Sequence, residues 1–287
     1  METTRLFIKL TRWNDWILNL LVVAAGYVIS RPVIGESLGN LILFIIAFFL
    51  FESFGFAIND YFDAKSDSKN PKTKNLIAMG LIKKSHAMIF CILLSLAIFA
   101  LCAILLPLEV SYVVLAIYIV FVLYSCPPFR FKEKFILDIS VHGIFMSFLF
   151  AGAYIIGKPD NMNLILLAIP AFFISSIVCT TQEMRDIKSD KKSMFKTTAI
   201  KLCYQGSLKL VRAEFIMALL SFIYVVLFYM PHYMLLFLLA FTFYAKVLFS
   251  DIKQDEFFQK SIQSCNRSIV ALVLIGLALA PFYLGLI

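Results

Sequence analysis

Apolar runs of about twenty residues, long enough to cross a bilayer, recur along the whole chain and constrain its fold more than any other feature. The 287 residues are 61% hydrophobic and only 15% charged, which is far more apolar than a soluble domain. Because backbone groups in lipid must be paired internally, each run is expected to be a helix. We therefore expect an all-α integral membrane fold in one domain over residues 1–287, with nine transmembrane helices around a central cavity capped by cytoplasmic loops. The expected spans cover residues 14–31, 39–60, 85–106, 110–127, 136–157, 161–182, 208–230, 232–250 and 267–287.

The basic residues fall on one side of the expected membrane. Of the 26 lysines and arginines, only Arg31 and Lys158 lie in segments that face the other side. By the positive-inside rule, the N-terminus and the loops 61–84 and 183–207 face the cytoplasm, and the C-terminus faces out. The net charge of +8 therefore reflects orientation in a lipid bilayer and phosphate binding, and we expect no nucleic-acid partner.

An acidic motif follows directly on the second apolar run. Asn59, Asp63 and Asp67 are spaced by four residues, so they share one face of a helix at the membrane surface. Carboxylates this close repel one another and are costly near the membrane core, so a cation is expected beside them. Oxygen ligands without a nearby cysteine or histidine favour Mg²⁺ over Zn²⁺. The alternative is a solvated helix end that happens to be acidic.

A second acidic cluster lies at the end of the sixth apolar run. Two such clusters make it a poor explanation that acidic residues lie at these helix ends by coincidence. The second cluster comprises Glu183, Asp186 and Asp190, and it also leads into a basic loop. Between the two clusters, a double proline at 127–128 ends a span and leaves Arg130 and Lys132 close to the membrane surface. Carboxylates that hold Mg²⁺ and basic residues that cover phosphate oxygens describe a diphosphate site. Because the site opens into a hydrophobic bundle, a prenyl diphosphate fits both of its halves.

These motifs resemble those of the UbiA intramembrane prenyltransferases. The pattern Asn-Asp-x-x-Asp-x-x-x-Asp lies at 59–67, Tyr-Ser-x-Pro-Pro-x-Arg-x-Lys at 124–132, and Asp-x-x-x-Asp at 186–190, in the family's order. The resemblance covers the whole chain and implies an integral membrane enzyme of isoprenoid biosynthesis. Such an enzyme moves a prenyl group from a prenyl diphosphate donor to a hydrophobic, often aromatic, acceptor with Mg²⁺.

The resemblance also implies roles for individual residues. Asp63 with Asp67 and Asp186 with Asp190 are the expected metal-binding pairs, and Asn59 and Tyr124 complete the expected catalytic set. Tyr124 is expected over the reacting carbon. The expected substrate contacts are Lys74, Asn75, Arg130, Lys132, Glu52 and Glu183.

Three of these positions are distinctive. Lys74 and Asn75 stand where many relatives have a basic residue followed by proline, so the arginine-proline pair is absent here. Glu52 lies seven residues before Asn59, hence on the same helix face and about 10 Å deeper. Because a charge at that depth is costly, we expect Glu52 to bind the acceptor, with a structural acid as the alternative.

The sequence leaves the acceptor open. A quinone-ring precursor is the first expectation, whereas residues 70–72 and 125–132 are also similar to the branch of the family that extends carotenoids. Ether-lipid head groups and polyprenyl phosphates are further alternatives. From other classes, a membrane cation transporter and a non-enzymatic scaffold are the alternatives. Both acidic clusters lie at cytoplasmic helix ends beside basic loops, which favours the prenyltransferase over either of them.

Overall fold

The computed structural model describes residues 2–30, 34–69, 73–157, 163–192 and 196–229, together with 242, 245–246, 248–249 and 260. Apart from a few isolated residues, the expected spans 232–250 and 267–287 lie outside this part of the chain, so the count of nine spans stays a prediction. The helices are α1 (Glu2–Leu10), α2 (Trp13–Trp16), η1 (Ile17–Asn19), α3 (Leu20–Ile29), α4 (Ile34–Asp67), α5 (Lys84–Ile104), α6 (Leu108–Ser125), η2 (Phe131–Glu133), α7 (Leu137–Ile156), α8 (Leu164–Lys192) and α9 (Thr198–Tyr229).

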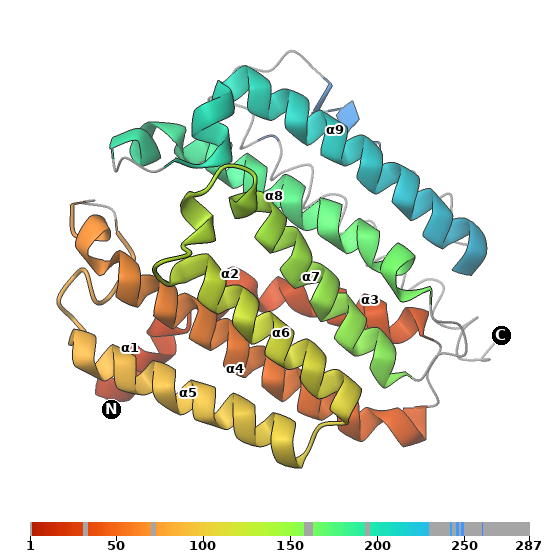
Figure 1. Ribbon diagram of the computed structural model, residues 1–287, viewed down its shortest axis with the longest axis horizontal. Helices are drawn as coiled ribbons and strands as arrows, with labels where there is room; N and C mark the ends of the chain where they lie inside the picture. The colour runs from red at the N-terminus through yellow and green to blue at the C-terminus, as the bar shows by residue number, and fades with distance from the viewer. Residues whose placement is uncertain are drawn as a thin grey trace. The chain divides into compact units, whose positions relative to one another are not determined.

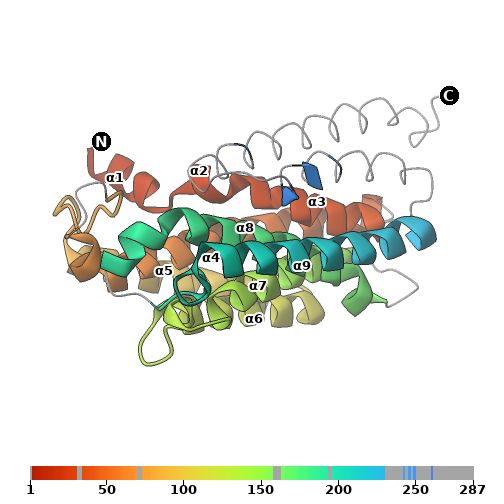
Figure 2. The ribbon, with the colours of Figure 1, turned by 90° about the horizontal axis from the view of Figure 1, so that it is seen from above.

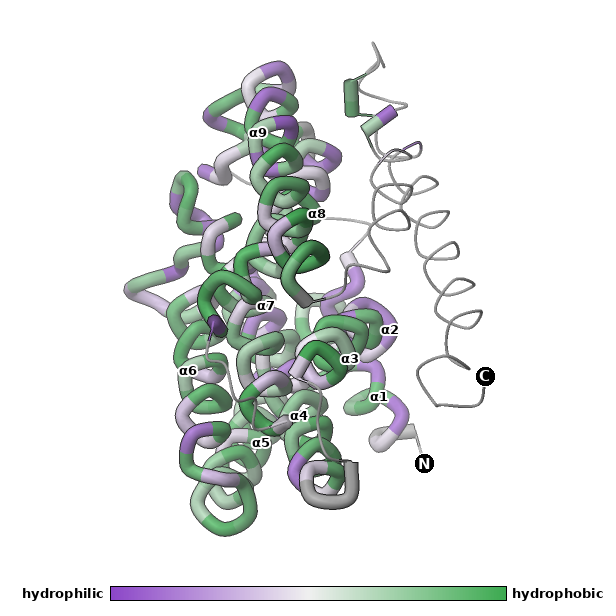
Figure 3. The backbone as a smooth tube through the Cα atoms, turned by 90° about the vertical axis from the view of Figure 1, so that its right-hand side faces the viewer, coloured by the Kyte–Doolittle hydropathy of each residue, from purple (hydrophilic) through white to green (hydrophobic). Residues whose placement is uncertain are grey.

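Six of the described helices are long and apolar enough to cross a membrane. They belong to α4, α5, α6, α7, α8 and α9, and they correspond to the second through seventh expected spans. Figure 3 shows mostly hydrophobic residues along the long helices. The prediction of an all-α, multi-pass membrane fold is therefore confirmed.

The first expected span, 14–31, is not one continuous helix. Arg12 has a left-handed backbone with φ of 49°, and α2, the 3₁₀ turn η1 and α3 follow one another in short pieces. The indole of Trp16 is buried, and its ring lies edge-on to those of Phe48 and Phe49, each with its centroid 5.2 Å away. Irregular backbone at membrane depth is tolerated where protein covers it, and here α4 provides that cover.

The chain divides into two compact units, Met1–Leu164 and Ile165–Ile287. In the first unit, α4 packs against α5, α6 and α7, and α3 packs against α7 (Figure 1). Phenylalanines of α4, including Phe44, Phe48 and Phe51, are fully buried at its centre. A Cβ atom on Gly26 of α3 would lie 2.4 Å from the Phe150 carbonyl oxygen, so glycine permits the close approach of α3 to α7.

In the second unit, α8 and α9 run side by side (Figure 2). Their shared apolar core includes Ile177 and Met184 from α8 and Val211 and Phe215 from α9. Glu214 is buried between them and accepts hydrogen bonds from Ser176 Oγ at 2.5 Å and Thr180 Oγ1 at 3.3 Å. Within a bilayer the hydrophobic effect does not drive helices together, because lipid is as apolar as their side chains. Hydrogen bonds of this kind therefore contribute to helix association.

Candidate functional site

The last turns of α4 carry one asparagine and three aspartates, Asn59, Asp60, Asp63 and Asp67, which we call the acidic end of α4. Asp60 and Asp63 are buried, and Asn59 and Asp67 are half-buried. The C-terminal end of a helix carries the negative end of its dipole. Carboxylates there are disfavoured both by this dipole and by their repulsion of one another. Cationic partners are therefore needed for this arrangement to be stable.

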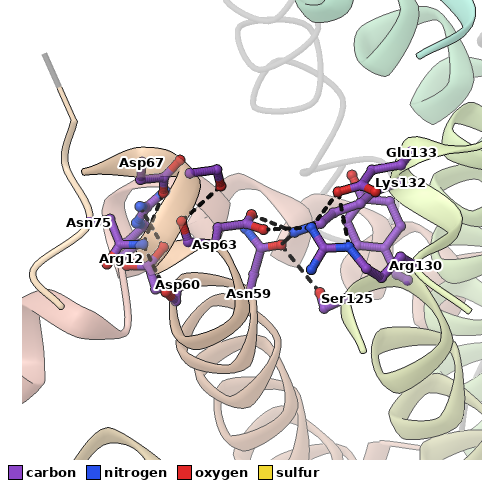
Figure 4. A network of polar contacts seen from close by, with 12 residues as sticks. Arg12, Asn59, Asp60, Asp63, Asp67, Asn75, Ser125, Arg130, Lys132 and Glu133 are labelled. Atoms are coloured by element: carbon purple, nitrogen blue, oxygen red, sulfur yellow. Dashed lines mark hydrogen bonds and ion pairs between the residues drawn. The ribbon is translucent and has the colours of Figure 1, made fainter. Parts of the chain in front are cut away.

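The chain supplies those cations from the segment that follows α6. Lys132 Nζ donates a hydrogen bond to Asn59 Oδ1 at 2.6 Å and forms an ion pair with Asp63 (Figure 4). Arg130 Nη2 lies 3.1 Å from the other Asp63 oxygen and also pairs with Glu133. Both oxygens of the Asp63 carboxylate are thus held by basic side chains.

Local geometry brings this basic turn, residues 126–134, back to α4. Ser125 ends α6, and its hydroxyl donates to Asn59 Oδ1 at 3.3 Å. Arg130 then adopts a left-handed backbone with φ of 42°, and the short helix η2 carries Lys132. Burial lowers the pKa of Lys132, whereas the neighbouring Asp63 carboxylate opposes that shift. The hydrogen bond to Glu133 raises the pKa of Arg130, despite its partial burial.

Arg12 is the cation on the other side of the acidic end. Its Nη2 lies 2.7 Å from Asp60 Oδ1, and its guanidinium lies 5.9 Å from the centre of the Phe56 ring. Sequence reasoning did not single out Asp60, although it lies inside the motif. The two residues are 48 positions apart, so no local signal links them.

The segment after α4 contributes Asn75, which is fully buried. Its amide nitrogen donates to Asp67 Oδ2 at 2.9 Å and to the Asp60 carbonyl oxygen at 2.8 Å. The neighbouring Lys74 is exposed and stays a predicted substrate contact. Asn75 was expected to contact substrate as well, but the structure commits its side chain to the acidic end of α4.

Tyr124 lies one residue before the end of α6 and faces α7. Its hydroxyl is 3.1 Å from His142 Nε2, and the two rings meet edge to face at 84° with centroids 5.1 Å apart. Both side chains are half-buried. The structure therefore adds His142 as a partner of a predicted catalytic residue.

Glu52 lies two turns deeper on α4 and is 1% exposed. Asn19, in the 3₁₀ turn η1, donates to Glu52 Oε1 at 2.7 Å. Asn19 lies in the 3₁₀ turn that interrupts the first expected span, so this contact is made where the helix is irregular. The break was missed, since the sequence around Asn19 contains neither glycine nor proline.

The second acidic cluster lies near the end of α8, in the second unit. Glu183 Oε2 accepts a hydrogen bond from the Ala199 backbone N–H at 3.1 Å, so it caps the first turn of α9. Asp186 pairs with its neighbour Arg185 through contacts of 2.8 and 2.5 Å, in a position exposed to solvent. Asp190 is half-buried.

The acidic end of α4 offers oxygen donors only, which suits Mg²⁺. Among the described residues, no group of three or more histidine, cysteine, aspartate or glutamate side chains is arranged as a metal site. In this arrangement Lys132 and Arg130 hold both Asp63 oxygens. The donor set fits the ion, provided that the basic turn releases Asp63.

The membrane-length helices define a polytopic membrane protein, and the buried acidic helix end that basic side chains cover is its candidate ligand site. The model of the UbiA prenyltransferase family matches residues 19–275. The chain therefore belongs to the UbiA prenyltransferase family, and the predicted family and class of enzyme are confirmed.

Solved structures share this fold. A UbiA homologue from Archaeoglobus fulgidus bound to GPP and Mg²⁺ is 19% identical, with a TM-score of 0.74 over 93% of this chain and 99% of that chain. A homologue from Aeropyrum pernix K1 without ligand is 18% identical, with a TM-score of 0.72 over 96% and 98%. A digeranylgeranylglyceryl phosphate synthase is 17% identical, with a TM-score of 0.71 over 97% of both chains. No match was found among curated proteins.

Proposed function

We propose that this enzyme transfers a prenyl group from a prenyl diphosphate to a hydrophobic acceptor at the acidic end of α4. The observation that carries the proposal is the meeting of Asn59 and Asp63 with Lys132 and Arg130. At one membrane-surface site, carboxylates can hold the metal ion that a diphosphate requires, and basic side chains can neutralise its charge directly. The family assignment supplies the reaction class, and the fold shared with a homologue bound to GPP and Mg²⁺ supports the donor.

Asp63 and Asp67, with Asn59 beside them, are the side chains that would hold Mg²⁺ in the first unit. Asp186 and Asp190 are the proposed second pair, and Glu183 supports them by fixing the start of α9. Bound Mg²⁺ stabilises the negative charge that grows on a diphosphate leaving group. Because the family model spans both units, we infer that residues 1–287 act as one prenyltransferase domain.

Lys132 and Arg130 first pair with Asp63 and later bind the diphosphate of the donor. Without substrate they neutralise Asp63, and on donor binding they exchange its oxygens for phosphate oxygens. Arg130 presents a planar fork of donors and Lys132 a single ammonium, so together they cover several oxygens. The exposed Lys74 adds a third basic contact.

The reaction that this arrangement supports begins with ionisation of the bond between the prenyl carbon and the diphosphate oxygen. The electron pair leaves with the diphosphate, and the allylic cation is attacked by an acceptor carbon or oxygen, which then loses its proton. Tyr124 is proposed to face the reacting carbon, where the electron-rich ring face favours a cation. His142 holds the Tyr124 hydroxyl.

The acceptor is hydrophobic, and Glu52 is its proposed polar contact. A buried carboxylate with an amide partner suits an acceptor that donates a hydrogen bond, such as the hydroxyl of a quinone precursor. A carotenoid or lipid acceptor is the alternative. The positive-inside pattern supports an orientation with the acidic end of α4 at the cytoplasmic face of the cell membrane.

The test is product formation by the purified protein in detergent with Mg²⁺. Geranyl, farnesyl and geranylgeranyl diphosphates are each incubated with a membrane-lipid extract, and products are read by mass spectrometry. We expect an acceptor whose mass rises by one prenyl unit only when Mg²⁺ is present. Metal-dependent ion flux in liposomes without any prenylated product would instead support the transporter alternative.

A further inference from the structure

Asn75 has an unusual position for a polar side chain in a loop. It follows α4 by eight residues and is fully buried, whereas Lys74 before it is exposed. A buried amide is costly unless its donors and acceptors are used. The partners of Asn75 therefore indicate what this residue does.

All of the hydrogen-bonding capacity of the Asn75 side chain is used. Its Nδ2 donates to Asp67 Oδ2 at 2.9 Å and to the Asp60 carbonyl oxygen at 2.8 Å (Figure 4). Its Oδ1 accepts from the backbone N–H groups of Ile77 at 3.0 Å and Ala78 at 3.1 Å. An asparagine side chain has two donors and two acceptor lone pairs, so none is left for a substrate.

The resemblance to the UbiA family places Asn75 where many relatives have proline, which has no side-chain amide. Proline cannot bridge Asp67 and Asp60 from that position, and it also lacks the backbone N–H that Asn75 donates to Thr73 Oγ1 at 3.1 Å. The departure from the family pattern thus coincides with a set of contacts to the acidic end of α4.

The contacts matter because of what they do to Asp67. Among the residues that the structure describes, Asn75 is the polar partner of Asp67, and it binds one of the two carboxylate oxygens. A carboxylate held by one oxygen has a fixed orientation and presents its other oxygen. Groups that orient a metal ligand in this way are typically worth 10-fold to 100-fold in metal affinity or activity.

We propose that Asn75 is a positioning residue that orients Asp67 for Mg²⁺ and ties segment 73–82 to the end of α4. This inference rests on the proposed function, because it assumes that Asp67 is a metal ligand. It replaces the predicted contact between Asn75 and substrate. The amide nitrogen orients the ligand, and the amide oxygen caps the turn that follows.

The two roles of the amide can be separated by substitution. Asn75→Asp keeps an oxygen that can accept from Ile77 and Ala78 but removes the donor to Asp67 and adds a like charge. Asn75→Ala removes both functions without adding charge. Asn19→Asp is the matched control, since it makes the same chemical change beside a carboxylate of α4, Glu52, away from the acidic end.

The experiment measures the unfolding temperature of the full-length protein in detergent as MgCl₂ is added, alone and with inorganic diphosphate. The midpoint is the Mg²⁺ concentration that gives half of the maximal rise in unfolding temperature. We expect Asn75→Asp and Asn75→Ala to raise this midpoint about tenfold or more, which corresponds to about 1.4 kcal/mol. Asn19→Asp is expected to stay within about twofold of the wild type.

The outcomes separate this inference from the proposed function. A wild-type protein that shows no response to Mg²⁺ contradicts the metal assignment itself. A normal wild-type response that Asn75→Asp leaves unchanged overturns the inference, because the amide donor then has no role at the metal. The inference is also overturned if only Asn75→Ala raises the Mg²⁺ midpoint. It is overturned as well if neither Asn75 variant folds while Asn19→Asp does, since Asn75 would then be a structural cap.

Discussion

Arg12 reaches Asp60 with its Nη2 2.7 Å from Oδ1, and this ion pair joins the N-terminal segment to the acidic end of α4. The Arg12 side chain is 22% exposed and the Asp60 side chain 2%. Within the described part of the chain, Arg12 Nε and Asp60 Oδ2 have no hydrogen-bond partner, so the pair holds by one contact and its charge. Breaking such a pair leaves an uncompensated buried charge.

We therefore predict that Arg12→Met destabilises the protein by about 3–5 kcal/mol. Adding Asp60→Asn removes the orphaned charge and should restore a large part of the lost stability. The measurement is thermal unfolding in detergent, with the exposed Arg5→Met as the control. Equal unfolding temperatures for the Arg12 and Arg5 variants would contradict the structural role of this pair.

Asp63→Asn tests the first metal pair, and Asp186→Asn tests the second. Several kcal/mol of charge stabilisation on the leaving group correspond to a rate loss of about a hundredfold or more. Both variants should still be inserted and monodisperse, because both sites lie near helix ends. Turnover with a prenyl diphosphate is the measurement, and the exposed Asp15→Asn is the control. Near-normal Mg²⁺-dependent turnover in either variant would refute the corresponding assignment.

Lys132→Met removes the ammonium that contacts both Asn59 and Asp63. If Lys132 transfers from Asp63 to the diphosphate, the KM for the donor should rise about tenfold, in line with the loss of a charge-assisted hydrogen bond. Lys134→Met, two residues along the same turn but exposed, should leave the donor KM within about twofold. Similar KM values for the two variants would show that Lys132 does not contact the donor.

Tyr124 and His142 can be tested as a pair. Tyr124→Phe and His142→Gln should each lower kcat, and the double variant should be hardly worse than either single one, because residues that share one hydrogen bond are not additive. The measurement is kcat for each of the four proteins at saturating donor. Additive losses would mean that His142 acts independently of Tyr124.

Glu52→Gln keeps the size of the side chain and replaces its carboxyl group with an amide. Since Glu52 lies about 10 Å below Asn59, we expect a changed preference among acceptors with little change in donor KM. Competition between acceptors, read by mass spectrometry, measures that preference. An unchanged acceptor profile would reduce Glu52 to a structural partner of Asn19.

Much of the fold followed from the sequence because its signals are local. Apolar runs of membrane length predicted the helices from α4 to α9, and the four-residue spacing of Asn59, Asp63 and Asp67 predicted their shared face. The need for a cation beside these acids was also predictable. That Lys132 and Arg130 would supply it directly was not, because a left-handed turn at Arg130 brings them to α4.

The missed features depend on irregular backbone or on long-range pairing. The break between Arg12 and Leu20 contains no glycine or proline that would predict it, and residues of this segment make both the Arg12–Asp60 and Asn19–Glu52 contacts. The contacts of Asn75 with Asp67 and Asp60 were not predicted, and they lie at a position where this chain departs from the family's pattern. In both cases the decisive partner lies on α4, outside any sequence window around the residue.

We expect the acidic end of α4 to bind Mg²⁺ and a prenyl diphosphate for transfer. Release of inorganic diphosphate by the purified full-length protein in detergent, with geranyl, farnesyl or geranylgeranyl diphosphate and the membrane-lipid extract, tests this expectation. We predict release that requires Mg²⁺, stops when EDTA removes the metal and is lost in Asp63→Asn. Absence of release from every donor, or release by Asp63→Asn at the wild-type rate, would contradict it.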